Sequence, residues 1–409
     1  MYPILRGFRV VECASFIAAP SCTLHMQQLG AEVIRIDPIE GGPDYRRWPV
    51  SPKGDSFYWE GLNKGKKSVA IDLSRPQGRE LATQLICAPG QPGGILVTNF
   101  PQNGFLSHDK LARHREDLIT VRVTGWSDGS PAVDYTVNAA VGLPYMTGSE
   151  ANGAEPVNHV LPAWDLMTGA YAAFVVLAAE LHRRETGQGR EIRLPLADVA
   201  LASLGHMGQI AEALFVGDRP RTGNALFGAF GRDFVCADGE RIMLVAITPR
   251  QWRGLVAALA IQAEVAELEC RLGVSFDEDE GLRYTHRTAL YPLVERAVSS
   301  RRKAEWAALL DPQGVCWGGY YTLGQALQQE PRLFASRDLF GLIDQVSGYR
   351  YPSPGAAAEF LGMPREFVCR APHLGEHTDA ILSEVLSLSS AQIGALHDAG
   401  VVRDAGAKA

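Results

Sequence analysis

The first 125 residues alternate short β-rich segments with helical segments, and this pattern constrains the fold more than any other feature of the chain. A strand, a helix and a second strand in succession pair their strands in parallel. Parallel sheets carry helices on their faces, so the pattern predicts an α/β fold. The expected strands are residues 8–13, 31–37, 68–73, 94–100 and 118–124, and the expected helices among them are 20–29 and 78–87.

Ligands of open α/β sheets bind outside the carboxyl ends of the strands. The loops that follow Cys13, Asp37, Leu73 and Phe100 are therefore the predicted binding region. Charge supports the same part of the chain, because residues 35–79 hold nine basic against six acidic side chains in a protein of net charge −7. This window fits either a solvated face or a site for a small polyanion.

The rest of the chain suggests a second, smaller domain. A long helix over 163–185, a strand over 190–194 and a helix over 195–215 precede a Gly-, Pro- and Arg-rich stretch at 219–231. A hairpin is expected around Asp238-Gly239, followed by helices over 249–309 and two short helices at 378–386 and 391–399. We predict a large domain from 1–218, a small domain from 219–324, and a return to the large domain over 325–409.

Composition excludes several classes of protein. The acidic net charge argues against a general nucleic-acid binder. The most apolar helical stretch, 171–181, is shorter than the ~20 residues that a bilayer span needs, and the first ten residues contain no signal-peptide pattern. Seven cysteines without a C-x-x-C pair suggest reduced thiols and a cytoplasmic enzyme.

Three familiar sequence motifs do not assign a function to this chain. The loop over 13–20 lacks the glycines of a dinucleotide site. The pattern H-x-x-E-H at His373–His377 would need a continuous helix to bind zinc, yet Pro372 precedes it and Gly375 interrupts it, so a loop is the better interpretation. No P-loop is present in the sequence.

Asp165 is the carboxylate that stands out. It lies at the start of the long helix, in the run Ala163-Trp164-Asp165-Leu166-Met167-Thr168-Gly169. A helix N-terminus favours negative charge, so Asp165 either stabilises the helix or is a reactive group held there.

Several runs, in order along nearly the whole chain, resemble the class III CoA transferases of the CaiB/BaiF type. They are Leu5–Glu12, Ala18–Pro20, Leu29–Ile36, Asn63–Ser68, Val97–Phe100, the Asp165 stretch, Arg221–Asn224 and Leu374–Thr378. The resemblance implies a Rossmann-like large domain built from both chain ends, a smaller α+β domain and an interlocked homodimer.

The same resemblance implies covalent chemistry on Asp165. A carboxylate attacks an acyl-CoA thioester, and CoA is passed through an anhydride and an aspartyl-CoA thioester. The particular branch suggested moves CoA between the two carboxyl groups of one branched unsaturated dicarboxylate. No cofactor beyond CoA and no metal is expected, and neither is a nucleic-acid or membrane partner.

Site residues follow from the resemblance and from charge. Asp134 matches an acid beside the nucleophile, while Arg47 and Arg232 are candidates for a free substrate carboxylate. The expected CoA contacts are Phe16, Ala18, Lys66, Lys67, Ile71, Arg75, Asn99 and Phe100.

Three alternatives remain open from the residues. Intermolecular transfer is one, although Ile17, Pro38 and Ser107 replace polar or basic residues of formyl-CoA transferases, whose glycine-run loop is missing near Gly228. An α-methylacyl-CoA racemase is another, although Val133 stands where its relatives carry His. The third is a non-catalytic CoA-binding protein.

Overall fold

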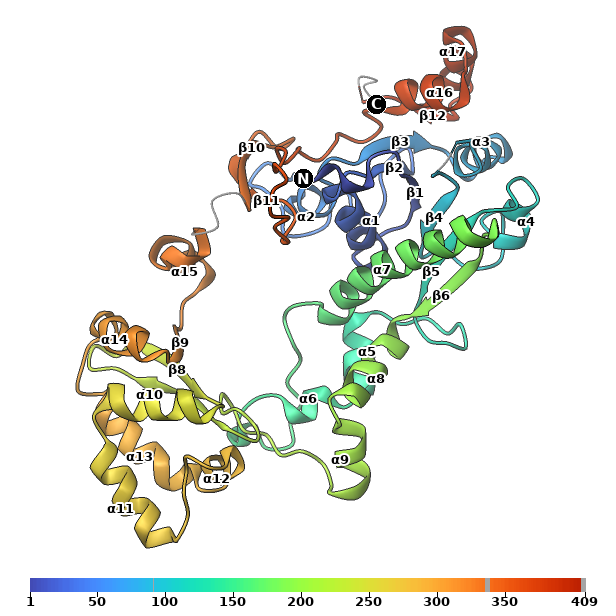
Figure 1. The fold of residues 1–409 in the computed structure, drawn as a ribbon. Helices are drawn as coiled ribbons and strands as arrows, with labels where there is room; N and C mark the ends of the chain where they lie inside the picture. The colour runs from blue at the N-terminus through green and yellow to red at the C-terminus, as the bar shows by residue number, and fades with distance from the viewer. Residues whose placement is uncertain (91, 335–338, 406–409) are drawn as a thin grey trace. The chain divides into compact units, whose positions relative to one another are not determined.

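The computed structural model describes residues 1–90, 92–334 and 339–405 (Figure 1). The chain forms two compact units. The large unit comprises Met1–Val141, His159–Ala211 and Phe334–Ala409, so it draws on both ends of the sequence. The small unit comprises Gly142–Asn158 and Glu212–Leu333, and it contains the whole of segment 219–324.

A seven-stranded sheet forms the centre of the large unit, in the order β12-β3-β2-β1-β4-β5-β6. Six of its strands are parallel and β12 runs antiparallel to β3. The predicted α/β fold with a parallel sheet is thereby confirmed, and the strand order reverses between β1 and β4, where such sheets bind ligands. The bounds are β1 Arg9–Cys13, β2 Glu32–Asp37, β3 Lys67–Ile71, β4 Ile95–Thr98, β5 Ile119–Thr124, β6 Glu191–Pro195 and β12 Val402–Arg403.

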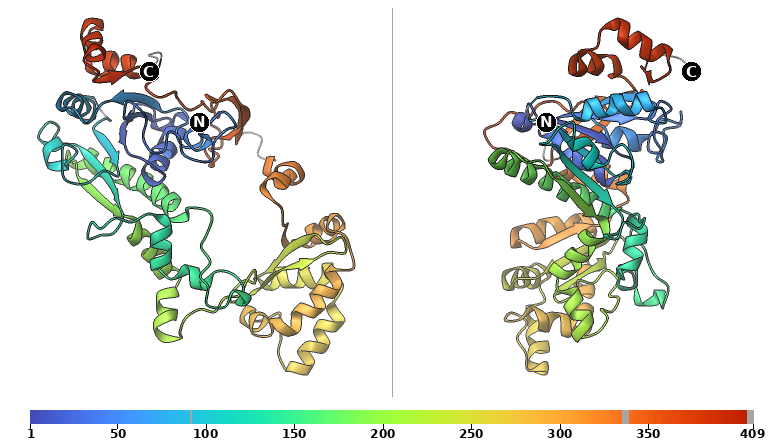
Figure 2. Two further views of the ribbon diagram at one scale, coloured as in Figure 1. Left: turned by 180° about the vertical axis from the view of Figure 1, so that it is seen from behind. Right: turned by 90° about the vertical axis from the view of Figure 1, so that its right-hand side faces the viewer.

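Helices cover both faces of this sheet because successive strand residues point to opposite sides. Val10 packs with α1 (Ala18–Gln28), α7 (Ala163–Thr186) and α8 (Leu196–His206). Val11 packs on the other face with α3 (Pro76–Ile86), α16 (Thr378–Leu386) and α17 (Ser390–Asp398). Figure 2 shows the red C-terminal helices returning to the blue strands of the N-terminal half. The result is a three-layer unit whose core needs both chain ends.

The small unit is built on an antiparallel sheet of β7 (Phe230–Val235), β8 (Arg241–Ala246) and β9 (Cys316–Gly319). The pairing of Val235 with Arg241 confirms the predicted hairpin. Phe230, Trp252 and Trp306 lie in a core between this sheet and its helices. Those helices are α10 Pro249–Leu259, α11 Gln262–Leu272, α12 Glu280–Thr285, α13 Arg287–Val298 and α14 Lys303–Leu310.

Shorter elements complete the two units. The helices are α2 Phe57–Leu62, α4 His108–Ala112, α5 Asp134–Ala140, α6 Leu143–Met146, α9 Gln209–Phe215 and α15 Leu323–Gln329. The strands β10 Phe340–Asp344 and β11 Arg350–Pro354 form a separate pair. Single 3-10 turns are η1 Pro3–Leu5, η2 Glu150–Asn152, η3 Asp311–Gln313 and η4 Pro331–Phe334.

One predicted helix is wrong in extent. Residues 195–215 form two helices, α8 and α9, rather than one. The break falls at Gly208, whose φ of 74° lies in the left-handed region that ends a helix.

The loop interpretation of the H-x-x-E-H motif is confirmed. Glu376 forms an ion pair with Arg370 at 2.6 Å, and α16 begins only after His377. Within residues 1–90, 92–334 and 339–405, no group of His, Cys, Asp and Glu side chains could hold a metal ion.

Helix α7 is long and apolar enough to cross a membrane by length and composition alone. Its Ala172 and Val176 are fully buried in the core that α7 shares with α1. A core helix of a globular unit passes the same test, so this one helix is no argument for a membrane protein.

Candidate active site

Asp165 is the third residue of α7, and a close helix contact fixes its place. A Cβ atom at Gly169 would lie 1.8 Å from Ser21 Oγ and 2.6 Å from the Ala18 carbonyl oxygen. Only glycine allows α7 to lie this near to α1. The contact brings the first turn of α7, and Asp165 with it, beside the beginning of α1.

Asp134 caps this helix. Its Oδ2 accepts hydrogen bonds from the backbone N–H groups of Trp164, at 2.7 Å, and of Asp165, at 3.1 Å. These N–H groups have no acceptor within the helix itself. Asp134 is 1% exposed, so a buried carboxylate holds the backbone of Asp165 in place.

His159 completes this arrangement, although no motif in the sequence pairs it with Asp134. Its Nε2 lies 2.5 Å from Asp134 Oδ1, and its ring contacts the edge of Tyr135 with centroids 5.6 Å apart. Position 133, directly before Asp134, holds a valine and not a histidine. The structure instead brings one to Asp134 from the loop preceding α7, a contact that no spacing rule predicts.

The Asp165 carboxyl is electrostatically unusual. Burial, together with the nearby charge of Asp134, raises its pKa to about 7, against a smaller lowering by Arg47. Among the residues that the structure describes, no donor makes a hydrogen bond or ion pair with this carboxylate. A carboxyl group that ionises near neutral pH and has no partner is available for chemistry.

Two aromatic rings hold Arg47 in the same region. Its guanidinium carbon lies 5.4 Å from the centre of the Phe16 ring and 5.5 Å from that of Tyr58. Phe16 is 40% exposed and adopts a φ of 70°, which is strained for a bulky residue. The Tyr58 hydroxyl is buried and has no hydrogen-bond partner among the described residues. Tyr58 is thus a further candidate that the sequence did not single out.

Asn99 joins the two strand-end loops at the point where the strand order reverses. Its Oδ1 accepts from the Ser15 N–H at 3.2 Å, and its Nδ2 donates to the Ser15 carbonyl at 2.9 Å. Phe100, the next residue, is partly buried against the core. These contacts fix the loop that carries Phe16 and leads into Ala18, the first residue of α1.

Ile71 and Arg75 lie at the same, carboxyl edge of the sheet. Ile71 ends β3 and is buried, whereas the side chain of Arg75 is 52% exposed. Arg75 forms an ion pair with Asp72 at 3.0 Å and donates to the Ala399 carbonyl. Of the three basic side chains expected at CoA phosphates, Arg75 alone is exposed at this edge.

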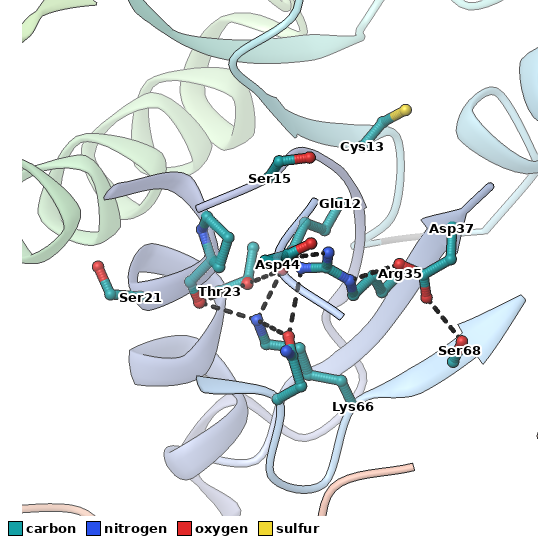
Figure 3. Close-up of polar contacts among 12 residues, drawn as sticks. Glu12, Cys13, Ser15, Ser21, Thr23, Arg35, Asp37, Asp44, Lys66 and Ser68 are labelled. Atoms are coloured by element: carbon teal, nitrogen blue, oxygen red, sulfur yellow. Dashed lines mark hydrogen bonds and ion pairs between the residues drawn. The ribbon is translucent and has the colours of Figure 1, made fainter. Parts of the chain in front are cut away.

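The expectation for the other two bases is wrong. Lys66 is 2% exposed, and its ammonium group contacts Glu12, the Pro20 carbonyl and Asn63 (Figure 3). It has no surface to offer a phosphate. Lys67 begins β3, at the opposite edge from Ile71, and forms an ion pair with Glu32 at 2.7 Å.

Lys66 belongs to a buried charge network centred on Arg35 (Figure 3). The guanidinium contacts Glu12 at 2.5 Å, Asp37 at 2.7 Å and Asp44 at 2.7 Å, and every side chain in the set is nearly inaccessible. Burial alone raises the pKa of Glu12, but the charges of Lys66 and Arg35 outweigh it and lower that pKa overall. Through Asp44, the network fixes the loop that leads to Arg47.

Arg232 lies in the small unit, on β7, where its guanidinium carbon is 4.7 Å from the centre of the Tyr291 ring. The other candidates named above, from Phe16 to Asp165, belong to the large unit. The structure therefore brings Asp134, Asp165, Arg47 and Phe16 together within one unit and places Arg232 in the other.

Comparison with known proteins gives a consistent result. The family model for CoA-transferase family III matches residues 5–378. The chain is 49% identical to 2-methylfumaryl-CoA isomerase of Chloroflexus aurantiacus, over 98% of each chain, and 25% identical to human succinyl-CoA:glutarate CoA-transferase, over 97% of this chain and 90% of that one. A CaiB/BaiF family protein from Brucella suis has the same fold, with a TM-score of 0.75 at 24% identity over 93% of this chain and 99% of that one. The chain belongs to CoA-transferase family III and is a CoA-transferring enzyme.

Proposed function

We propose that this enzyme moves CoA from one carboxyl group of a branched unsaturated dicarboxylate to the other carboxyl group of the same molecule. The substrate proposed is 2-methylfumaryl-CoA, also called mesaconyl-CoA, which the name of the 49% identical relative specifies. The observation that carries the proposal is the Asp165 carboxyl, which has no partner among the described residues and a pKa of about 7.

Each proposed step exchanges one acyl bond for another. The Asp165 carboxylate attacks the thioester carbon, and the C–S bond breaks to give a mixed anhydride and the CoA thiolate. The thiolate then attacks the Asp165 carbonyl carbon, which gives an aspartyl-CoA thioester and frees the substrate carboxylate. The second carboxylate of the substrate attacks this thioester, and the same two steps in reverse regenerate Asp165. Covalent catalysis divides one difficult exchange into easier ones.

The described side chains supply binding and positioning. Asp134 holds the backbone of Asp165, and Arg47 is proposed to bind the substrate carboxylate that is not attached to CoA. The Tyr58 hydroxyl is proposed to donate to an oxygen of the acyl group. The proposed CoA contacts are Phe16, Ala18, Ile71, Arg75, Asn99 and Phe100.

Isotope exchange tests whether transfer is intramolecular. During turnover of unlabelled mesaconyl-CoA, added ¹³C-labelled free mesaconate should not enter the product, because the acid released from CoA stays in the site and turns. Mass spectrometry of the product over the first turnovers measures the label. Label that enters at the rate of turnover would establish the alternative, intermolecular transfer between CoA and free acids, which is the activity that the human relative's name describes.

We also propose a homodimer, and one face of α7 supports it. Met167, Tyr171, Phe174 and Leu181 follow one another at helical spacing and are 44–62% exposed. Apolar side chains of this size gathered on one stripe are typical of an interface, and we propose a second copy of the chain as its occupant.

The variant Phe174→Glu should convert the dimer to a monomer, because it places a charge in the middle of this stripe. Light scattering at micromolar concentration measures the mass. Leu361→Glu is the matched control, since Leu361 is 88% exposed and lies outside α7. A wild-type protein that is monomeric, or a Phe174→Glu variant that remains a dimer, would contradict the proposed interface.

The cytoplasmic location expected from composition also remains a proposal. The seven cysteines form no disulfide, and Cys13 and Cys22 are buried as small apolar side chains. Free thiols agree with a reducing compartment.

A further inference from the structure

The small unit contains a cavity that no step of the proposed mechanism uses. It measures about 280 Å³ and lies between β7, the start of α13 and the segments around Glu150 and Thr222. The polar side chains in its lining that matter are Arg232, Arg287, Tyr291, Thr222, Asn224 and Glu150.

Two arginines line this cavity, and neither has a carboxylate partner among the described residues. The Arg232 guanidinium lies over the Tyr291 ring at 4.7 Å and over Phe234 at 5.2 Å. Arg287 lies over Tyr284 at 4.2 Å and donates to its carbonyl at 2.9 Å. Neither guanidinium forms an ion pair within the part of the chain that the structure describes. Stacking on rings orients both groups and leaves donors unused.

The acids of this region do not neutralise the pair. Asp233 follows Arg232 in β7, but its carboxylate forms an ion pair with Arg241 at 2.5 Å. Glu150 lines the cavity from an exposed position. Two acids therefore line the cavity, but Asp233 is paired with Arg241, so Glu150 alone is left to balance two arginines and the cavity keeps a positive charge.

Tyr291 provides a second, independent observation. Its hydroxyl is buried and has no hydrogen-bond partner in the part of the chain that the structure describes. The ring already packs on Phe230, with centroids 5.9 Å apart, so phenylalanine at this position would serve packing equally well. Burial raises the pKa of Tyr291, although the charges of Arg287 and Arg232 act against it, so the hydroxyl keeps its proton and remains a donor. A buried hydroxyl without an acceptor calls for one from a ligand.

We propose that Arg232, Arg287 and Tyr291 form a binding site for a carboxylate group of a small dicarboxylate. Arginine forks bind carboxylates through paired hydrogen bonds, and the hydroxyl supplies a further donor. A cavity of about 280 Å³ suits a ligand of this size, whereas a nucleotide is too large for it.

The binding of an oxyanion follows from the side chains alone, but its identification as a dicarboxylate rests on the proposed function. The carboxylate can belong to a free acid or to the acyl group of the acyl-CoA. The chemistry recognised is the same in both cases, and experiment separates them.

Calorimetric titration of the full chain carrying Arg47→Gln tests the free acid, because this background removes the carboxylate partner proposed near Asp165. Mesaconate should still bind. Adding Arg232→Gln or Arg287→Gln should weaken binding at least about tenfold, and Tyr291→Phe about threefold or more. Arg253→Gln is the matched control, since Arg253 lies in the same unit, is paired with Asp277 and does not line the cavity.

Kinetics in the chain with Arg47 intact test the acyl group. A rise of about tenfold or more in the KM for mesaconyl-CoA in Arg232→Gln and Arg287→Gln, but not in Arg253→Gln, assigns the site to the acyl carboxylate. If inorganic phosphate binds but the arginine variants change neither mesaconate binding nor the KM for mesaconyl-CoA, the assignment to a carboxylate is overturned. If the variants change nothing in the titration or in the kinetics, and phosphate does not bind, the site itself is overturned. The covalent route through Asp165 is tested separately. Retention of turnover in Asp165 variants would exclude that route and would leave the carboxylate site unaffected.

Discussion

The variant Asp165→Asn should lose turnover by about 10⁴-fold or more, as expected when a covalent nucleophile is removed. Asparagine keeps the size of the side chain and its hydrogen-bonding capacity but has no carboxylate to attack a thioester. Measurement of mesaconyl-CoA conversion under single-turnover conditions detects even a slow residual reaction. An active Asp165→Asn enzyme would exclude the covalent route.

The same substitution should increase stability above pH 7. The pKa of Asp165 is about 7 in the folded chain, whereas an unfolded chain has a value near 3.9. Between these values the folded state binds the extra proton, so ionisation reduces the free energy of unfolding as the pH rises through this window. Asparagine removes that cost. The free energy of unfolding should therefore rise by on the order of 1–3 kcal/mol, once the partial exposure of the group is allowed for.

Urea unfolding at pH 5 and pH 8 separates this explanation from a helix-cap role. A mutation that removes a mere N-terminal charge should destabilise the protein at both pH values, by about 0.5–2 kcal/mol. A reactive group held in an unfavourable environment gives the opposite sign, with a larger gain in stability at pH 8 than at pH 5. The activity of the wild type should also rise through pH 7 as the carboxylate forms.

The second large effect is expected in the buried network. Arg35→Gln should destabilise the large unit by about 3–5 kcal/mol at pH 7, because Glu12, Asp37 and Asp44 would then share Lys66 as their remaining cation in the network. Urea unfolding followed by circular dichroism measures the loss. The defect should shrink towards pH 5, since uncompensated buried carboxylates take up protons.

An exposed ion pair gives the control. Arg253→Gln breaks a contact with Asp277 in which both side chains are more than 40% exposed, and it should cost no more than about 1 kcal/mol. An Arg35→Gln variant as stable as this control would show that the network contributes little to the fold.

Local pattern predicted much of the fold. The spacing of β-rich and helical segments was enough for the strands β1 to β5, and the hairpin followed from a two-residue turn signal. The break between α8 and α9 was not predicted, because Gly208 is a single glycine within a long apolar run. Its left-handed backbone conformation appears only in the structure.

The sequence can single out a residue whose proposed role belongs to one motif, as it does for Asp165. The site was not predictable where a role depends on pairing between distant segments. Lys66 and Lys67 are neighbours in the sequence, yet one is buried against Glu12 and the other joins Glu32 at the edge of the sheet. Counting charges cannot separate two such lysines, and it cannot place His159 against Asp134 either.

The position of β12 has a consequence for the order in which the chain can fold. The outer edge of β3 pairs with Val402 and Arg403, and α16 and α17 contribute Ile381, Leu382 and Leu396 to the core on that side. A ribosome makes β3 early and these partners only after the entire small unit has been synthesised. During that interval the nascent sheet has an unpaired edge and an uncovered apolar surface, which are the features that recruit chaperones and promote aggregation. Synthesis of α16, α17 and β12, rather than synthesis of the segment around Asp165, is therefore the event that completes the large unit.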